Sequence, residues 1–145
     1  MVKIRKCQWI RKPEKVRILS SRELTFVCDG EHHLVWTTDE DERITFSHTG
    51  EACCGIAVIF SLDQGLRIFD DGEMTRLELD FLGIRTAEQW PAGASVPLTV
   101  EKQADTISFL RGQQRLYSLT FPSIAASASI SFWAKGGGQT TFIFS

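Results

Sequence analysis

The sequence predicts an all-β protein built from short antiparallel strands, arranged as a sandwich or a barrel. Apolar and polar residues alternate in many short runs with a period of two, which is typical of strands that bury one face. Turn-forming pairs such as Asp29-Gly30 and Arg111-Gly112 separate these runs. Helical periodicity is nearly absent, and only one short helix or 3₁₀ turn is expected, near residues 86–89.

The expected strands follow one another at short intervals along the chain. They cover residues 15–20, 23–28, 43–48, 55–62, 65–69, 73–83, 97–103, 106–111, 114–121, 128–135 and 139–144. The run 55–62 is apolar on both faces, which predicts a central strand that is covered on both sides. Most of the other runs have one apolar and one polar face, so we expect them to lie between a core and solvent.

Length and composition predict one soluble domain over residues 1–145. Apolar residues make up 43% of the chain and charged residues 23%, which is ordinary globular composition and excludes wholesale disorder. The longest apolar run, residues 55–60, is far too short to span a membrane, so no membrane partner is expected. The first residues lack the apolar stretch of a secretory signal, which predicts a cytoplasmic location and reduced cysteines.

Charge is distributed unevenly along the chain. Residues 1–17 carry seven basic side chains and one acidic one, whereas the remainder carries nine basic and seventeen acidic ones. Opposite charge predicts that this basic N-terminal segment lies on the acidic body of its own domain. No nucleic-acid partner is expected, because the rest of the chain is acidic and the segment lacks alternating aromatic and basic residues.

No metal or other cofactor is expected. The four cysteines do not form a CxxC pair, which most structural zinc sites require. His32 and His33 are adjacent, so in an extended strand they point to opposite faces and cannot chelate one ion together.

The run 73–83 is the segment that carries candidate chemistry. Thr75, Leu77, Leu79 and Phe81 share one face of this strand. Arg76, Glu78 and Asp80 share the other face. Retaining glycosidases need two carboxyl groups about 5–5.5 Å apart, and Glu78 and Asp80 can meet that separation. Spacing alone favours the alternative, in which the three side chains form a solvent-facing row of weak cross-strand ion pairs.

The segment 77–83, Leu-Glu-Leu-Asp-Phe-Leu-Gly, resembles the active-site strand of glycoside hydrolase family 16. That family, the laminarinases and lichenases, carries Glu-x-Asp-x-Glu on the concave sheet of a concanavalin A-like jelly roll. In one alignment Glu78 takes the nucleophile position and the acid/base position is not acidic. In the other, Asp80 takes the acid/base position and Arg76 stands where the nucleophile belongs. One catalytic carboxylate is absent either way, so whether the chain is an enzyme is left open and a non-catalytic module is favoured.

The layout of residues 9–144 is similar to an uncharacterised family of concanavalin A-like domains known as regulation-of-enolase-like. The similarity rests on the unit from Trp9 to Trp36, the strand 55–60 and the closing strand 141–144. The hairpin 105–119 is similar to concanavalin A-like domains in general. The resemblance implies a two-sheet antiparallel jelly-roll sandwich of the concanavalin A-like type.

This resemblance implies that a carbohydrate or a related polar ligand binds on the concave face. Sugars stack on aromatic rings and form hydrogen bonds with a few convergent polar groups. The candidate ligand-binding residues are Arg76, Glu78, Asp80, Lys135 and Trp133, with Arg67, Arg85 and Trp90 nearby in sequence. Two alternatives are a small retaining glycosidase that uses Glu78 and Asp80, and a protein-interaction domain or homodimer joined through sheet edges.

Overall fold

The computed structural model describes residues 2–61, 64–71, 73–81, 84–91, 96–122, 124 and 127–145. Within these ranges, the side chains of residues 60, 61, 64, 81, 84–88, 90 and 91 lie outside the description.

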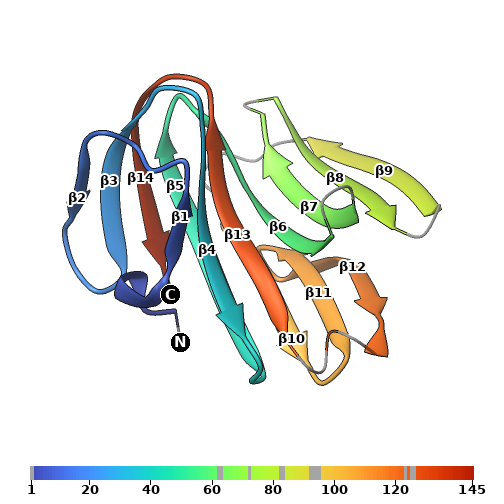
Figure 1. Ribbon diagram of the computed structural model, residues 1–145. Coiled ribbons are helices and arrows are strands. Elements are labelled where there is room, and N and C mark those ends of the chain that lie inside the picture. The colour runs from blue at the N-terminus through green and yellow to red at the C-terminus, as the bar shows by residue number, and fades with distance from the viewer. Residues whose placement is uncertain are drawn as a thin grey trace.

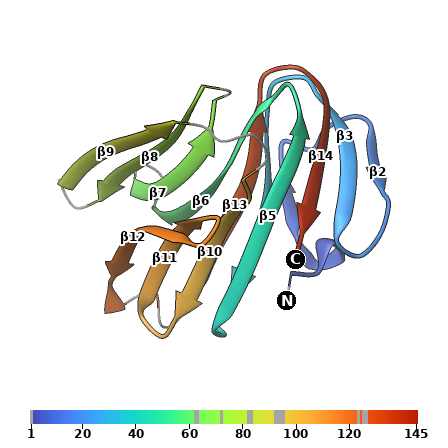
Figure 2. The same cartoon turned by 180° about the vertical axis from the view of Figure 1, so that it is seen from behind.

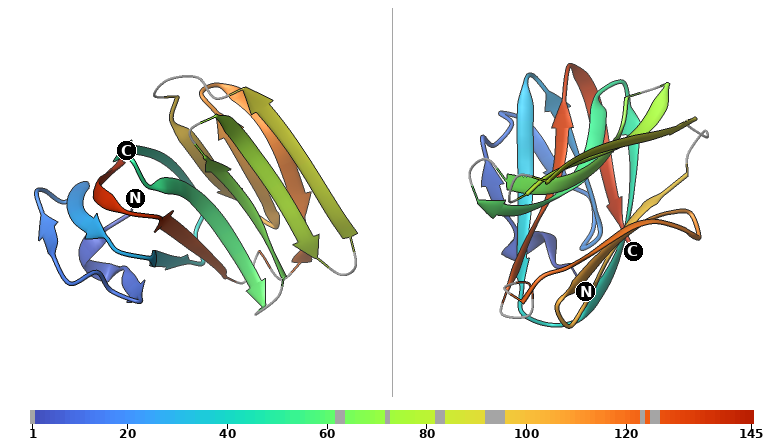
Figure 3. Two further views of the ribbon diagram at one scale, coloured as in Figure 1. Left: turned by 90° about the horizontal axis from the view of Figure 1, so that it is seen from above. Right: turned by 90° about the vertical axis from the view of Figure 1, so that its right-hand side faces the viewer.

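Two antiparallel sheets of seven strands each form the described part of the chain (Figures 1 and 2). Sheet A runs in the order β1 (Gln8–Ile10), β4 (Glu31–Thr38), β13 (Ala128–Lys135), β6 (Cys53–Ser61), β7 (Gln64–Asp70), β8 (Met74–Phe81) and β9 (Ile84–Pro91). Sheet B runs in the order β12 (Gln114–Thr120), β11 (Thr106–Arg111), β10 (Leu98–Gln103), β5 (Glu42–Gly50), β14 (Gly138–Phe144), β3 (Glu23–Cys28) and β2 (Val16–Ile18). The view from above shows β8 and β9 of one layer lying across β11 and β12 of the other (Figure 3). The predicted all-β sandwich is therefore confirmed.

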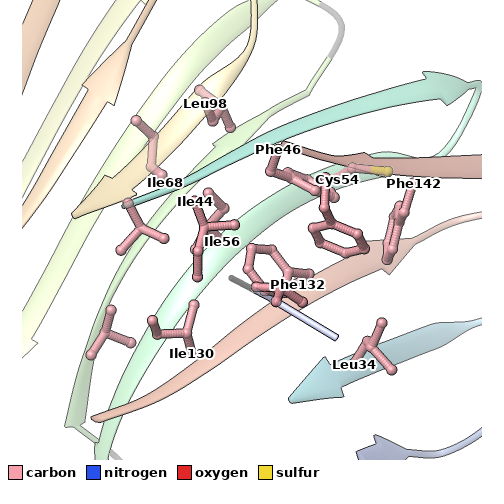
Figure 4. Packing of buried hydrophobic residues seen from close by; sticks show 14 of the residues in the cluster. Leu34, Ile44, Phe46, Cys54, Ile56, Ile68, Leu98, Ile130, Phe132 and Phe142 are labelled. Carbon is pink, nitrogen blue, oxygen red and sulfur yellow. The ribbon is translucent and has the colours of Figure 1, made fainter. Parts of the chain in front are cut away.

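Aromatic rings from both sheets meet in the middle of the sandwich. Phe132 on β13 lies with its ring centroid 4.8 Å from that of Phe144 and 5.3 Å from that of Phe46. Phe46 and Phe142, on adjacent strands of sheet B, are 4.9 Å apart in an edge-to-face arrangement. Leu34 and Cys54 extend this cluster (Figure 4). Each buried phenylalanine contributes about 1.5–3 kcal/mol through its removal from water, so this cluster holds the two layers together.

Two long strands differ from the sequence-based expectation. Residues 86–89, expected to be helical, lie inside β9, which pairs with β8 from Met74↔Pro91 to Phe81↔Ile84. The helix prediction was wrong because pairing along the whole length of β8 outweighs the weak local preference of Ala, Glu and Gln for a helix. β4 was missed because His32 and His33 interrupt its apolar alternation, although His32 is buried and half-buried His33 lies on the opposite face.

The basic N-terminal segment packs on the sandwich. Val2 and Ile4 are buried, and the 3₁₀ turn η1 (Ile4–Lys6) leads into β1 at the edge of sheet A. The ring of Trp9 meets Phe26 edge-on at 5.6 Å. The ring of His32 is hydrogen-bonded to the carbonyl oxygen of Arg11 at 2.5 Å, which fastens the end of β1 to the β3–β4 hairpin. Among the described residues, no helix has the length and apolarity needed to cross a membrane.

Candidate functional site

The candidate site lies on the outer face of sheet A, which points away from the core. In β8, Thr75, Leu77 and Leu79 are buried between the sheets, so Arg76 and Glu78 project outward. The strand register places Glu78 opposite Arg67 on β7 and Arg76 opposite Phe69. We use the name outer patch for the side chains that gather here, which are His33, Arg67, Phe69, Arg76, Glu78 and Trp133.

Arg67 and Glu78 form a cross-strand ion pair. Arg67 Nε donates a hydrogen bond to Glu78 Oε2 at 2.9 Å, and the guanidinium carbon lies 5.2 Å from the centre of the Phe69 ring. The two side chains are 49% and 41% exposed, so solvent screens the pair and it contributes at most about 1 kcal/mol to stability. The ion-pair row that spacing favoured is present here, and its polar atoms still reach solvent.

Arg76 is fixed by two partners. Its Nε donates to Asp71 Oδ2, and its Nη1 donates to Gln89 Oε1 at 3.0 Å on β9. The hydrogen bond from Arg76 is the largest cause that lowers the pKa of Asp71 to about 2, and the backbone N–H groups of Met74 and Glu73 add to it. The same contact raises the pKa of Arg76. Both groups are therefore charged at neutral pH, and the two hydrogen bonds hold the guanidinium in a fixed position.

Trp133 lies on the outer face, as predicted, but its side chain is enclosed. It is only 5% exposed, with the Phe69 ring 5.4 Å away and the His33 ring 6.4 Å away. Gly55, the β6 partner of both Trp133 and Phe69, makes this approach possible. A Cβ at Gly55 would stand 2.3 Å from the carbonyl oxygen of Ile68, so any larger residue would force the backbone to shift. The indole therefore supports Phe69 and does not offer an open stacking surface.

The remaining predicted site residues lie at the ends of this face or outside the description. Asp80 is exposed on the same side of β8, and Lys135 is exposed at the end of β13. Arg85 is the register partner of Asp80, on the outer face. Trp90 is the partner of Thr75, which is buried between the sheets, so its position in β9 belongs to the inner face and not to the predicted site. The side chains of Arg85 and Trp90 lie outside the described residues.

Sequence reasoning missed Phe69, His33 and Gln89. Phe69 and Gln89 are brought to Arg76 by strand pairing, and His33 is hydrogen-bonded through Nδ1 to the buried Ser131 Oγ at 2.8 Å. A signal for Phe69 existed, because the Asp-Asp-Gly turn at 70–72 predicts that the strands on either side of it pair as a hairpin.

The outer patch is suited to binding polar groups. It brings guanidinium donors, a carboxylate acceptor and the aromatic ring of Phe69 together in one region of the sheet. The carboxylate of Glu78, the residue expected to act as nucleophile, is already engaged by Arg67. Within the described ranges, no group of three or more His, Cys, Asp and Glu side chains is arranged to hold a metal ion.

The sequence matches no family model and no curated protein. The fold is similar to the carbohydrate-binding module CBM66 from Bacillus subtilis, with 9% identity, a TM-score of 0.53, and coverage of 99% of this chain and 90% of that one. It is also similar to the laminarinase catalytic domain from Thermotoga maritima, at 8% identity and a TM-score of 0.60 over 92% and 79% of the two chains. The PSpry domain of TRIM65 matches at 8% identity and a TM-score of 0.63 over 96% and 91%.

Identities this low establish the fold alone. The chain is a two-sheet antiparallel jelly-roll sandwich. The expected resemblance to the regulation-of-enolase-like family stays a prediction, because no family model matches.

Proposed function

We propose that this protein is a non-catalytic jelly-roll module that binds a carbohydrate or a related polar ligand on the outer face of sheet A. The observation that supports it best is the cross-strand set of Arg67, Glu78 and Arg76 beside the ring of Phe69. Sugar rings present hydroxyl groups around their rim and C–H bonds on their faces, and this set offers partners for both.

The ion pairs prepare the site for binding. Arg67 and Glu78 are about half exposed while they hold each other, and Gln89 and Asp71 hold Arg76 in the same way. Side chains that are already ordered lose little rotamer entropy when a ligand binds, so a shallow polar site can still give useful affinity. In this proposal Asp80 and Lys135 contact the ends of the ligand, Arg85 contributes from β9 as the register partner of Asp80, and Trp133 positions Phe69. Trp90 is not assigned to the site, because its register partner Thr75 lies on the inner face of β8.

The structural neighbours support a carbohydrate ligand. One is described as a carbohydrate-binding module, and another is a family 16 endo-glucanase in complex with an oligosaccharide derivative. The TRIM65 domain shares the architecture with no sugar in its description, so the fold cannot assign the ligand and the side chains must.

The alternative of a small retaining glycosidase has weaker support. Such an enzyme needs a free nucleophile and an acid/base group on opposite sides of the scissile bond. Glu78 is held by Arg67, and Arg76 occupies one of the positions that would have to be acidic. We therefore assign the carboxylates of this face to ligand binding.

Isothermal titration calorimetry against a broad panel of glycans that includes β-glucan oligosaccharides tests the proposal. We expect saturable binding that weakens about tenfold in Glu78→Gln, because the carboxylate is an acceptor for ligand hydroxyls. Glu101→Gln is the matched control, since Glu101 forms a 3.0 Å ion pair with Arg43 on the outer face of sheet B. Absence of binding to the whole panel, or equal weakening in both variants, would contradict the proposal. Hydrolysis of a β-glucan that disappears in Glu78→Gln would instead establish the glycosidase.

A further inference from the structure

A concave region lies at the edge of sheet A, apart from the outer patch. It is a hollow of about 700 Å³ bounded by η1 on one side and by the turn between β4 and β5 on the other. The hollow exists because β1 pairs with β4 only from Gln8↔Val35 to Ile10↔His33. Residues 36–38 of β4 continue past the start of β1, so the edge of sheet A is uncovered there. Its volume is within the range of small-molecule sites, about 300–1,000 Å³.

The walls of the hollow carry opposite charges. Lys3 and Lys6 line the η1 side, and Asp39 and Glu40 line the turn side. All four are exposed, and across the described residues their ammonium and carboxylate groups make no hydrogen bond or ion pair. Charged groups of both signs thus face one space without neutralising each other.

Trp36 and Glu42 complete the acidic wall. Trp36 Nε1 donates a hydrogen bond to Glu42 Oε2 at 2.6 Å, which fixes the indole against the carboxylate. Burial would raise the pKa of Glu42, but a hydrogen bond from the chain's amino terminus, the positive charge of that terminus and the hydrogen bonds from Trp36 and Thr38 lower it below its ordinary value. Glu42 is therefore ionised at neutral pH. An aromatic ring beside carboxylates is a favourable environment for an organic cation.

We propose that this hollow binds a small zwitterion, of the kind of an ω-amino acid. The ammonium end lies between Trp36 and the carboxylates of the turn, and the carboxylate end lies between Lys3 and Lys6. A ligand with a single charge would meet attraction at one wall and repulsion at the other. A zwitterion satisfies both walls at once, and charge-assisted hydrogen bonds at each end fix its orientation.

NMR of isotope-labelled protein tests this directly. The indole N–H signal of Trp36 is assigned as the one that disappears in Trp36→Phe. The compounds titrated are ε-aminocaproate, caproate and n-hexylamine, at constant ionic strength. These three molecules share a chain length and differ in charge. We expect the Trp36 indole signal to shift saturably with ε-aminocaproate and to require about tenfold more of either singly charged compound.

Charge-removing variants locate the ligand. Lys6→Met and Glu40→Gln should each weaken binding of ε-aminocaproate about tenfold, because each removes one end of the charge pair. Lys12→Met and Glu14→Gln are matched controls from the same basic segment, outside the residues that line the hollow. Equal titration curves for the three probes, or curves unchanged by Lys6→Met and Glu40→Gln, would overturn the proposal. Glu78→Gln should leave the titration curve of ε-aminocaproate unchanged, because Glu78 lies outside the residues that line the hollow. The zwitterion proposal and the glycan proposal can therefore fail independently of each other.

Discussion

The outer faces of the two sheets follow the same alternation but present different chemistry. On sheet B, hydroxyl groups pair with one another across strands, as in Thr45–Thr99 at 3.1 Å and Ser108–Ser118 at 2.9 Å. On sheet A, aromatic rings stand among the charged groups, and the donors at Arg67 and Arg76 remain part-exposed. A polar outer face is thus common to both sheets, whereas aromatic side chains distinguish the one to which we assign the ligand.

Replacing Trp133 by Ala gives the largest expected effect and tests whether the outer face of sheet A is built around an enclosed ring. We expect a loss of about 3–5 kcal/mol in the free energy of unfolding, because a buried aromatic side chain leaves a cavity between Phe69 and His33. Urea denaturation measures the loss. A change of less than about 1 kcal/mol would mean that the ring is exposed in solution and free to stack on a ligand.

Leu110→Ala sharpens this comparison, because Leu110 is also 5% exposed but lies outside the main core cluster on β11. We expect it to destabilise the fold by about 2–5 kcal/mol without altering glycan binding. In Trp133→Ala, the displaced Phe69 ring should weaken glycan binding as well. Unaltered binding in both variants would remove Trp133 from the proposed site.

Replacing Gly55 by Ala gives the next largest effect. The added Cβ would stand 2.3 Å from a backbone oxygen of β7, so β6 and β7 must separate locally. We expect a loss of about 1–3 kcal/mol, which is typical of overpacking, measured by thermal and urea unfolding. Gly137→Ala is the control, because a Cβ there meets its nearest atom only at 3.9 Å. Equal losses in the free energy of unfolding for the two substitutions would contradict the requirement for glycine at position 55, beside Trp133 and Phe69.

The sequence predicts most of the fold, because alternation reports directly which side of a strand is buried. It places Arg76, Glu78 and Trp133 on the correct side of their strands. It does not predict that Trp133 is enclosed, because enclosure depends on which residues of β6, β7 and β4 stand beside it. Cross-strand register is set by contacts between distant segments, and spacing within one strand does not report it.

The hollow at the edge of sheet A was missed for the same reason. Lys3, Lys6 and the acidic turn are separate charged segments in the sequence, and the general prediction was that the basic segment lies on an acidic body. Only the short length of β1, which ends its pairing with β4 at Val35, leaves the opposed charges facing a space.

The smallest expected effect concerns the ion pair that anchors Arg76. The pKa of Asp71 is lowered from its ordinary value of 3.8 to about 2, chiefly by the hydrogen bond from Arg76. A lowered folded-state pKa favours folding above the ordinary value, and this contribution disappears as the pH falls from about 4 towards 2. NMR titration of the Asp71 carboxyl carbon should show a midpoint near 2.

In Arg76→Met the midpoint should move back towards the ordinary value, because the charged donor is gone. Gln89→Ala removes the other partner of Arg76 and should leave the midpoint of Asp71 low, since Arg76 still donates to Asp71. An ordinary midpoint in the unmodified protein would mean that Arg76 swings freely in solution. Arg76 would then not be fixed in advance on the outer face of sheet A, and Arg67 alone would orient the ligand.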